Sequence, residues 1–558
     1  MPATFNERPH QNEKAEALAY VRRLMEQARK ESNHEDLPKL EKLLELIDSK
    51  RYGLVWEEHA ELVEEEMKTK IPVFVEDETR KIRGNPKSED YNFLLEGDNL
   101  HSLHLLQKTH VGKIDVIYID PPYNTGNKDF IYNDKIVDKT DGYSHSKWLS
   151  FMSKRLELAK ELLSETGVIF ISIDDNEQAQ LKLLCDEIFG EDNFIGTFIV
   201  NTTPNGRDYG AMAKQHEYSL MYSKKISKVH FNKIKDEEKK FKYKDNIGEF
   251  NIHPLYNSNV AFTPANRPNL HYPFYVQPNT KDENGFYKIA LVKSEGSIEI
   301  YPPKSMKGDA QFVWRWGKVK SEANINVEIV GYKVNGEFRI VQKMRGDSKI
   351  IRSLLIDKKY STRTGTSELE KILGYKSFVY PKTVNLLKIF LQASTYSNSI
   401  VLDFFAGSGT TGHAVAQLNK EDGGNRKYIL CTNNENKICE EVTYKRLSNI
   451  QEELPHNLKY FKTRFIEKED EELEYSLLNN VKTLIELEHA IDLSESDKAV
   501  AFSLSAIREL DLTEIKTVYV RQHSHALMDK EDLVRYEGIE LIDVPEYYFS
   551  KEMREAGL

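Results

Sequence analysis

The sequence predicts an α/β fold built on a mostly parallel sheet. Short runs rich in β-branched and aromatic residues, such as KIDVIYID at 113–120 and GVIFISID at 167–174, alternate with longer segments of helical period. Buried parallel strands have this composition, and a helix is the usual connection between them. The alternation returns in the stretch 400–450. We therefore expect one α/β domain that is divided into two parts.

An irregular block separates the two parts. Between about residue 223 and residue 375 the chain is rich in proline and aromatic residues, as in TPANRPNLHYPFYVQP at 263–278 and FVWRWGKVKS at 312–321. Apolar periodicity also marks helices near the N-terminus and an acidic, helical C-terminal stretch that ends in the strand-like IKTVYV. The predicted divisions are an N-terminal helical module at 1–75, a first α/β half at 76–223, an inserted block at 224–375, a second α/β half at 376–460 and a small C-terminal module at 461–558.

Composition excludes several classes of protein. With 558 residues, of which 39% are hydrophobic, the chain is long enough for several domains with buried cores. It has no apolar run of the length that a membrane helix needs and no signal-peptide pattern at its N-terminus. Its three cysteines form neither a disulfide framework nor a CxxC metal pair. We expect a soluble protein of a reducing compartment, with no membrane contact and no metal.

The net charge of −11 argues only mildly against a nucleic-acid partner. The charge is uneven along the chain, because the segment SKKISKVHFNKIK at 223–235 is basic whereas EKEDEELEYS at 467–476 is acidic. A partner responds to the local field, so the sum decides little.

The first motif with chemical content is DPPYNTG at 120–126, at the carboxyl end of a predicted strand. Open α/β sheets bind ligands at this edge. Two prolines force a stiff turn, which holds the Asp120 carboxylate, backbone carbonyl groups and the Tyr123 ring in a fixed relation. Such a set suits a flat ring with an exocyclic amine, because Asp120 and the Pro121 carbonyl can accept its two N–H bonds while Tyr123 stacks on the ring.

The second motif is VLDFFAGSGTTGHA at 401–414, a strand followed by a glycine turn and a helix start. The turn lets the backbone approach a ligand closely, and the helix N-terminus favours an anionic group. No GKS or GKT follows, so the motif is not a P-loop. Beyond the next strand, Glu435 either binds ribose hydroxyls or serves as an N-terminal helix acid.

These two motifs together resemble the signature motifs of amino-methylating DNA methyltransferases. The target-base motif precedes the cofactor motif, which is the order of the beta class of adenine-N6 enzymes. From about residue 50 to about residue 450 the chain further resembles the modification subunits of type III restriction–modification systems. The segments that carry this resemblance include YGLVWE, FLLEGDNLHSLHLLQ, HSKWLSFMSKRL, SIDDNE, VWRWGK, GTSELEKILG, FVYPKT and TNNENKICEEVTYKRL.

The resemblance implies a Rossmann-like methyltransferase domain that uses S-adenosylmethionine, with helices on both faces of its sheet and a target recognition domain inserted at 224–375. It implies methyl transfer to the N6 amine of an adenine that is flipped out of double-stranded DNA. The implied catalytic residues are Asp120, Pro121, Pro122 and Tyr123. The implied cofactor-binding residues are Asp98, Lys382, Asp403, Phe404, Ala406, Gly407, Gly409, Thr410 and Glu435, with Lys382 near the methionine end.

The resemblance also implies partners. It indicates a homodimer. It also indicates an ATP-dependent restriction subunit with helicase and nuclease activity, because this chain contains neither a helicase motif nor a nuclease motif and DNA cleavage would need a second protein. The apolar residues Trp148, Phe151 and Met152 are either a dimer surface or part of the core. His216 either lies beside the flipped-base pocket or is an ordinary core or loop histidine. Candidate DNA contacts, each of which could instead be a solvated charge, are Arg207, Lys214, Arg267, Arg315, Lys318, Lys320 and Arg345.

Two other functions remain open from the sequence. One is a stand-alone methyltransferase that acts on adenine N6 or cytosine N4, since the chemistry permits either amine. The other is a DNA-recognition module without catalysis, against which both intact motifs argue.

Overall fold

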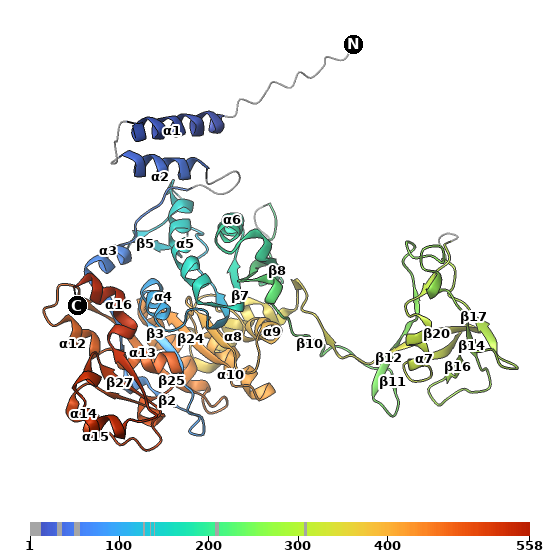
Figure 1. Cartoon of the computed structure of the whole chain (residues 1–558). Helices are drawn as coiled ribbons and strands as arrows, with labels where there is room; N and C mark the ends of the chain where they lie inside the picture. The colour runs from blue at the N-terminus through green and yellow to red at the C-terminus, as the bar shows by residue number, and fades with distance from the viewer. Residues whose placement is uncertain are drawn as a thin grey trace, which may run out of the picture. The chain divides into compact units, whose positions relative to one another are not determined.

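The computed structural model describes residues 13–30, 36–48, 56–126, 129–133, 135–138, 140–206, 211–305 and 310–557 (Figure 1). The chain forms two compact units. Unit 1 comprises Met1–Asn232 with Ile351–Leu558, and unit 2 comprises Lys233–Ile350. Unit 2 is shorter than the predicted block at 224–375, because strand β22 (Leu354–Leu355) and the helix that follows it belong to unit 1.

Unit 1 is built on one eleven-stranded sheet, which confirms the predicted α/β fold. The six strands from β25 to β7 are parallel, and antiparallel pairs occur only toward the two edges. In sheet order the strands are β1 (Lys70–Glu76), β25 (Asn457–Glu467), β3 (Asn92–Glu96), β24 (Lys427–Thr432), β23 (Ile400–Asp403), β4 (Ile114–Ile119), β7 (Leu163–Ile173), β9 (His216–Ser223), β8 (Phe194–Asn201) and β22, with β2 (Ile82–Arg83) also paired to β25.

The central strands are buried on both faces, which explains their continuous apolar runs. In β4, Ile117 and Ile119 join one hydrophobic cluster, whereas Val116 and Tyr118 join another on the opposite face. The helices divide in the same way. The first cluster includes residues of α4 (Asn99–Gln107), α5 (Ser144–Leu162) and α6 (Gln178–Phe189), and the second includes residues of α9 (Val384–Ser394), α10 (Thr410–Asp422) and α11 (Lys445–Ile450).

Two of the predicted domain boundaries fall inside strands of the main sheet. Strand β1 lies across the boundary expected at residue 75, and β25 lies across the one expected at residue 460, because these two strands pair with each other at the sheet edge. Helices α1 (Glu13–Lys30), α2 (Asp36–Asp48) and α3 (Leu62–Thr69) precede β1. Among the described residues, no helix has both the length and the apolar content needed to cross a bilayer.

The C-terminal stretch contains a second, small parallel sheet of β26 (Lys498–Ala501), β27 (Thr517–Arg521) and β28 (Glu540–Val544). The predicted strand IKTVYV corresponds to β27. This stretch belongs to unit 1, because side chains from it join the core on one face of the main sheet. Its helices are α12 (Leu473–Leu478), α13 (Val481–His489), α14 (Leu504–Glu509), α15 (Lys530–Arg535) and α16 (Glu546–Glu555).

Unit 2 consists mainly of short antiparallel strands, and its aromatic richness fills a core around Phe274 and Trp314. A five-stranded sheet runs in the order β11 (Tyr243–Lys244), β12 (Glu249–Pro254), β20 (Glu337–Met344), β19 (Ile329–Val334) and β15 (Phe286–Tyr287). Unit 2 also contains a three-stranded sheet of β16 (Ile289–Ala290), β14 (Phe274–Val276) and β17 (Ile298–Ile300). Two further strand pairs are β10 (Ile234–Lys235) with β21 (Ser348–Lys349) and β13 (Tyr256–Asn257) with β18 (Val313–Trp314). Helix α7 (Lys318–Asn324) belongs to the same unit.

A buried ionic cluster ties the C-terminal stretch to the main sheet. The ammonium group of Lys459, on β25, is 1% exposed and lies 3.2 Å from Glu76 Oε2, 2.8 Å from Glu486 Oε1 and 3.5 Å from Asp492 Oδ1. Lys81 forms an ion pair with the same Asp492. Removal of one partner from such a cluster leaves uncompensated charge in the interior.

We therefore expect Lys459→Ala to lower the free energy of unfolding by about 3–5 kcal/mol, the usual cost of breaking a buried ion pair from one side. Urea denaturation measures this loss. Lys482→Ala is the matched control, because Lys482 approaches the same Glu486 at 3.9 Å but is 45% exposed, and its removal should cost little. Equal losses in the two variants would contradict the buried cluster's role.

Candidate active site

The two motif loops lie side by side because β4 and β23 are parallel neighbours in the sheet. Val401 is paired with Val116 and Leu402 with Ile117, so DPPYNTG and FAGSG both leave the same edge. A cavity of about 2250 Å³ opens there, and side chains of unit 1 line it. The predicted site residues among its lining are Asp98, Asp120, Pro121, Pro122, Tyr123, Lys382, Phe404, Gly407 and Glu435.

The first loop is fixed by contacts on either side of its prolines. The Trp148 indole N–H donates to the Pro122 carbonyl at 2.7 Å, and the Asn124 amide donates to the buried Glu177 carboxylate at 2.6 Å. Asn124 itself has a left-handed φ of 57°, a conformation that asparagine tolerates. No described residue donates a hydrogen bond to the Pro121 carbonyl. This carbonyl is therefore available to a ligand in the cavity.

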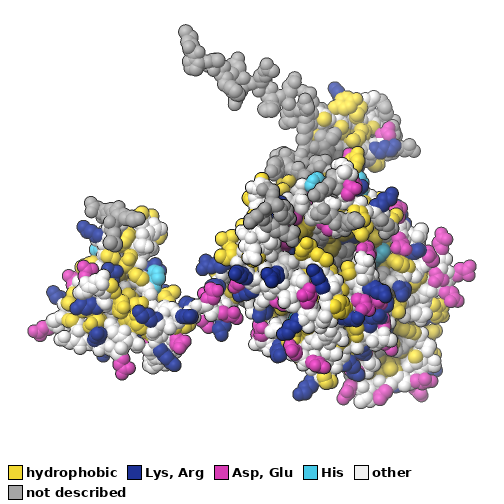
Figure 2. Space-filling view, turned by 180° about the vertical axis from the view of Figure 1, so that it is seen from behind, with side chains coloured by type: hydrophobic (Ala, Val, Ile, Leu, Met, Phe, Trp, Pro, Cys, Tyr) yellow, Lys and Arg dark blue, Asp and Glu magenta, His cyan; other side chains and the backbone are white. Residues whose placement is uncertain are grey.

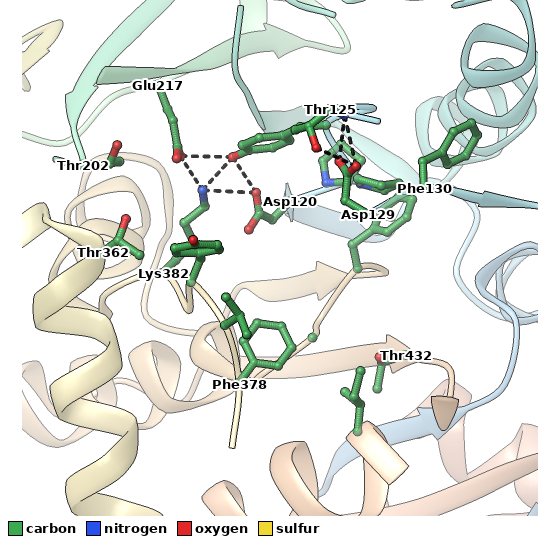
Figure 3. A pocket seen from close by; sticks show the side chains of 18 of the residues that line it. Asp120, Thr125, Asp129, Phe130, Thr202, Glu217, Thr362, Phe378, Lys382 and Thr432 are labelled. Carbon is green, nitrogen blue, oxygen red and sulfur yellow. Dashed lines mark hydrogen bonds and ion pairs between the residues drawn. The ribbon is translucent and has the colours of Figure 1, made fainter. Parts of the chain in front are cut away.

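Four polar side chains meet at the inner end of the cavity (Figure 3). The Tyr123 hydroxyl contacts Asp120 Oδ1 at 2.8 Å and Glu217 Oε2 at 3.1 Å. The Lys382 ammonium group donates to the Tyr123 oxygen at 2.6 Å and to Glu217 Oε2 at 2.6 Å, and it lies 3.3 Å from Asp120 Oδ1. The cluster thus combines two carboxylates, one phenol and one cation.

Burial and charge act in opposite directions on these groups. Burial raises the pKa of Asp120, Lys382 lowers it and Glu217 raises it, and the net shift is upward. Burial would lower the pKa of Lys382, but the two carboxylates raise it above its usual range, so the side chain remains a cation. Burial and the same carboxylates raise the pKa of Tyr123, which therefore stays a neutral phenol.

Lys382 connects the two motif loops. The sequence predicted a place near the methionine end of the cofactor, whereas the ammonium group lies at the DPPY motif. Its backbone carbonyl accepts a hydrogen bond of 3.2 Å from Thr410 Oγ1, at the start of the helix that follows FAGSG. Any contact of Lys382 with the cofactor itself remains a prediction.

The second loop needs glycine at two positions. Gly407 has φ +49° and Gly409 has φ +73°, conformations that side chains disfavour. A Cβ at Gly409 would lie 3.0 Å from the Thr443 methyl group, and one at Gly407 would lie 3.3 Å from the Phe378 ring. The backbone can therefore face the cavity closely at Gly407.

Asp403 supports this loop from beneath. It is 2% exposed, and its two oxygens accept hydrogen bonds from the Phe405 N–H at 3.0 Å and from the Thr411 hydroxyl at 2.5 Å. Burial raises its pKa to about 7. Asp403 therefore joins the two ends of the turn, and it does not line the cavity; nor do Ala406, Gly409 and Thr410.

Residues that the sequence did not single out brace the loop as well. Fully buried Arg446 donates to the Thr410 hydroxyl at 2.8 Å and to the Ser408 carbonyl at 3.3 Å. The Thr443 hydroxyl donates to the Gly407 carbonyl at 2.6 Å from a π-helical turn, Ile438–Tyr444. Such turns are frequent at functional sites.

Two acidic residues flank the cavity at the ends of neighbouring strands. Asp98, after β3, caps α4 by accepting from the Leu100 N–H at 2.7 Å, and it lies 3.4 Å from buried Arg155. Glu435 follows β24 in a tight turn in which Asn436 and Lys437 both have left-handed φ. Consecutive left-handed residues other than glycine are strained, and such strain concentrates at functional sites.

Other predicted residues have different roles in the structure. Trp148 and Met152 are fully buried, so they belong to the core and offer no surface to a second chain. Glu217, adjacent to the predicted His216, is the residue that lines the cavity; His216 instead contacts the Tyr218 hydroxyl at 3.1 Å. The signal available in KQHEYSLMY was an acidic residue near the start of a predominantly apolar and aromatic strand.

The candidate DNA contacts also divide. Arg345 has a structural role, because its guanidinium group pairs with Asp245 at 2.7 Å and with Glu328 at 2.8 Å. Lys214 lies in unit 1, where it pairs with Asp175 at 2.9 Å, and Arg207 lies outside the described residues. The remaining candidates, all in unit 2, are Arg267, Arg315, Lys318 and Lys320.

The parallel sheet and the two motif loops at one of its edges are the features of an α/β enzyme that binds a cofactor and a substrate side by side. A family model described as "DNA methylase" matches residues 114–444, and the chain belongs to this family. The family uses S-adenosylmethionine as its methyl donor, which confirms the cofactor that the resemblance implied.

Individual relatives agree with the predicted resemblance. The chain is 37% identical over 354 residues to the type II methyltransferase M.KpnI of Klebsiella pneumoniae, an alignment that covers 62% of this chain and 82% of that protein. It is 36% identical over 444 residues to the type III restriction-modification enzyme EcoPI Mod subunit of Escherichia phage P1, which covers 71% of this chain and 66% of that protein. It is 31% identical over 447 residues to the EcoP15I Mod subunit of Escherichia coli, covering 70% and 66%. The alignments thus span just under two thirds of these two type III subunits.

The geometry of the glycine turn generates a prediction. Gly407→Asp should abolish binding of S-adenosylmethionine, because a side chain at this left-handed position would meet Phe378 and bring negative charge into the cavity. Isothermal titration calorimetry measures the affinity. Gly142→Asp is the control, since a Cβ there meets open space. Unchanged cofactor affinity in a folded Gly407→Asp protein would refute the placement.

Proposed function

We propose that this protein methylates the N6 amine of a flipped adenine in double-stranded DNA and serves as the modification and DNA-recognition subunit of a type III restriction–modification system. The observation that carries this proposal is that two hydrogen-bond acceptors, Asp120 Oδ2 and the Pro121 carbonyl oxygen, are both free beside the glycine loop. Asp120 uses Oδ1 for Tyr123 and Lys382, while no described residue donates to its Oδ2 or to the Pro121 carbonyl. An amine with two N–H bonds matches these two acceptors.

The chemistry needs orientation rather than an intermediate bound to the enzyme. The adenine amine is a poor nucleophile because its lone pair is delocalised into the ring. Acceptance of both N–H bonds by Asp120 and the Pro121 carbonyl favours return of electron density to the nitrogen. Tyr123 would stack on the base, and methyl transfer then requires the amine at about 3–3.5 Å from the donor carbon. After the transfer, Asp120 can take the excess proton from the nitrogen.

The residues present suit S-adenosylmethionine. Its methionine carboxylate requires backbone without a Cβ, which the turn at Gly407 provides, and the start of α10 favours an anion. Glu435 would accept from the ribose hydroxyls. Asp98 and Phe404 would complete the cofactor side, while the buried Asp403 and Thr410 would act by holding the loop.

Adenine is the preferred base because the motif reads DPPY, the form that the resemblance associates with adenine. Unit 2 is proposed as the target recognition domain, with Arg267, Arg315, Lys318 and Lys320 as candidate contacts to phosphates or base edges. A net charge of −11 does not oppose this role, because Figure 2 shows lysine and arginine side chains interspersed with acidic ones over the face in view. Partners in the proposal are a second copy of the chain and an ATP-dependent restriction subunit, in the cytoplasm of a bacterium or archaeon.

A stand-alone methyltransferase is the second candidate. It is favoured by the alignment with M.KpnI, a type II methyltransferase, over 82% of its length. A restriction subunit that co-purifies with this chain would support the type III assignment. Light scattering that gives the mass of a single chain at micromolar concentration would exclude the homodimer in either case.

The reaction is tested by its product. Duplex DNA incubated with the protein and S-adenosylmethionine should yield N6-methyladenine on nucleoside analysis. Asp120→Asn should lower the rate by about two orders of magnitude or more, the effect of losing one positioned electrostatic group at a reacting centre. Its cofactor affinity should remain, because Asp120 faces the amine. Asp192→Asn, an exposed carboxylate, is the control. N4-methylcytosine as the product would overturn the choice of base.

The recognition role is tested by exchange of unit 2. Replacement of Lys233–Ile350 by the corresponding segment of a related enzyme should transfer the methylated sequence motif with the segment, because base-edge contacts specify the target while phosphate contacts position it. Methylation-sensitive long-read sequencing reads the motif. Retention of the original motif by the exchanged protein would show that specificity lies in unit 1.

A further inference from the structure

Glu217 belongs to neither of the two motifs, yet it lies at the centre of the polar cluster. It is the second residue of β9, which is separated from β4 by β7 in the sheet. Its Oε2 accepts from the Lys382 ammonium group at 2.6 Å and contacts the Tyr123 hydroxyl at 3.1 Å. The side chain is 23% exposed and lines the cavity.

The hydrogen bonds leave a defined part of Asp120 free. All contacts of the cluster with Asp120 go to Oδ1, from the Tyr123 hydroxyl and from Lys382. The ammonium group has three protons, and its three oxygen neighbours are Asp120 Oδ1, Glu217 Oε2 and the Tyr123 oxygen. Figure 3 shows these contacts converging on one side of the carboxylate. The other oxygen, Oδ2, remains for the amine of the base.

We propose that Glu217 is a positioning residue for methyl transfer, which holds Lys382 and Tyr123 so that Asp120 presents one free oxygen to the target amine. The proposal rests on the proposed function, since it assigns the cluster a role in that reaction. Without the Glu217 carboxylate, the ammonium group would be left with Asp120 as its only anionic partner in the cluster. Asp120 would then be a weaker acceptor, and the Tyr123 ring would lose one of the contacts that fix its hydroxyl.

Charge gives Glu217 a second effect on the same step. Two carboxylates and one ammonium group give the cluster a formal net charge of −1. The methyl donor is a sulfonium cation, and the amine gains positive charge as it accepts the methyl group. A net negative cluster therefore stabilises the reacting groups. Neutralisation of Glu217 would bring the cluster to zero charge.

The pH dependence of the step distinguishes this role from support of the fold. The titratable and charged groups that face the cluster are Tyr118 of β4, Asp174 after β7, Asp403 at the end of β23, and Asp120, Tyr123, Glu217 and Lys382 themselves. The Glu217 charge raises the pKa of Asp120, and Lys382 lowers it. Loss of Glu217 should therefore lower the pKa of Asp120, while loss of Lys382 should raise it.

The experiment measures single-turnover methyl transfer by the full chain, at saturating duplex DNA and S-adenosylmethionine, across a range of pH. Glu217→Gln, which keeps the shape of the side chain, should lower the rate at neutral pH at least about tenfold. The acid limb of its rate–pH profile, where the rate falls as the pH decreases, should move to lower pH. Its affinities for cofactor and DNA should stay near those of the wild type. Glu217→Asp keeps the charge and should leave the acid limb near its original pH.

Lys382→Gln should shift the rate–pH profile in the opposite direction, because loss of the ammonium group raises the pKa of Asp120 and moves the acid limb to higher pH. This variant also tests the proposal if Glu217→Gln does not fold. Glu165→Gln is the matched control, since Glu165 pairs only with Lys225 and Lys228 among the described residues and is an exposed residue near the start of β7. It should transfer methyl groups at the wild-type rate with an unmoved acid limb.

Three results would overturn the proposal: a wild-type rate in Glu217→Gln, a lowered rate with an unmoved acid limb, or a loss of cofactor affinity equal to the loss of rate. The wild-type protein is measured in parallel. If it transfers no methyl group to DNA, the proposed function fails. If it is active and Glu217→Gln behaves like it, only the role of Glu217 fails.

Discussion

The parallel pairing of β4 with β23 is the constraint on which the site depends. These strands are separated by about 280 residues in the sequence, yet each contributes one motif loop to the same edge of the sheet. Their hydrogen-bond register fixes the distance between the amine-binding groups and the glycine turn. Both strands are buried under helices on two faces, so a slip of the register would disrupt the side-chain packing on both faces at once. A rigid core thus sets the geometry that an in-line transfer demands.

The sequence was sufficient for the fold class and for the two loops, because local patterns encode both. Strand composition, helix period and left-handed glycines are properties of consecutive residues. It was not sufficient for Glu217, whose importance arises only when β9 lies two strands away from β4. The same reason explains Lys382, which follows FVYP in the sequence but reaches DPPY in space, and Arg446, whose contacts to Ser408 and Thr410 cross a helix packing interface.

Boundaries were harder to predict than elements. The predicted divisions at 75 and 460 fall within β1 and within β25, because an edge pair formed between chain ends has no local marker. The block at 224–375 was too long, since β22 and the helix after it return to unit 1. Composition did identify the block itself, because its aromatic residues form a core of their own. Among its cations, Arg345 shows that a basic residue in a recognition block can be committed to folding.

The charges of the site show why the DPPY motif needs Lys382 and Glu217 beside it. Lys382 occupies one oxygen of Asp120, but a lysine alone would also neutralise the carboxylate that the reaction needs. Glu217 resolves the conflict, because it shares the ammonium group and returns the cluster to a net negative charge. The acceptor that faces the base is therefore defined by four side chains from three segments, of which the DPPY motif supplies two, Asp120 and Tyr123.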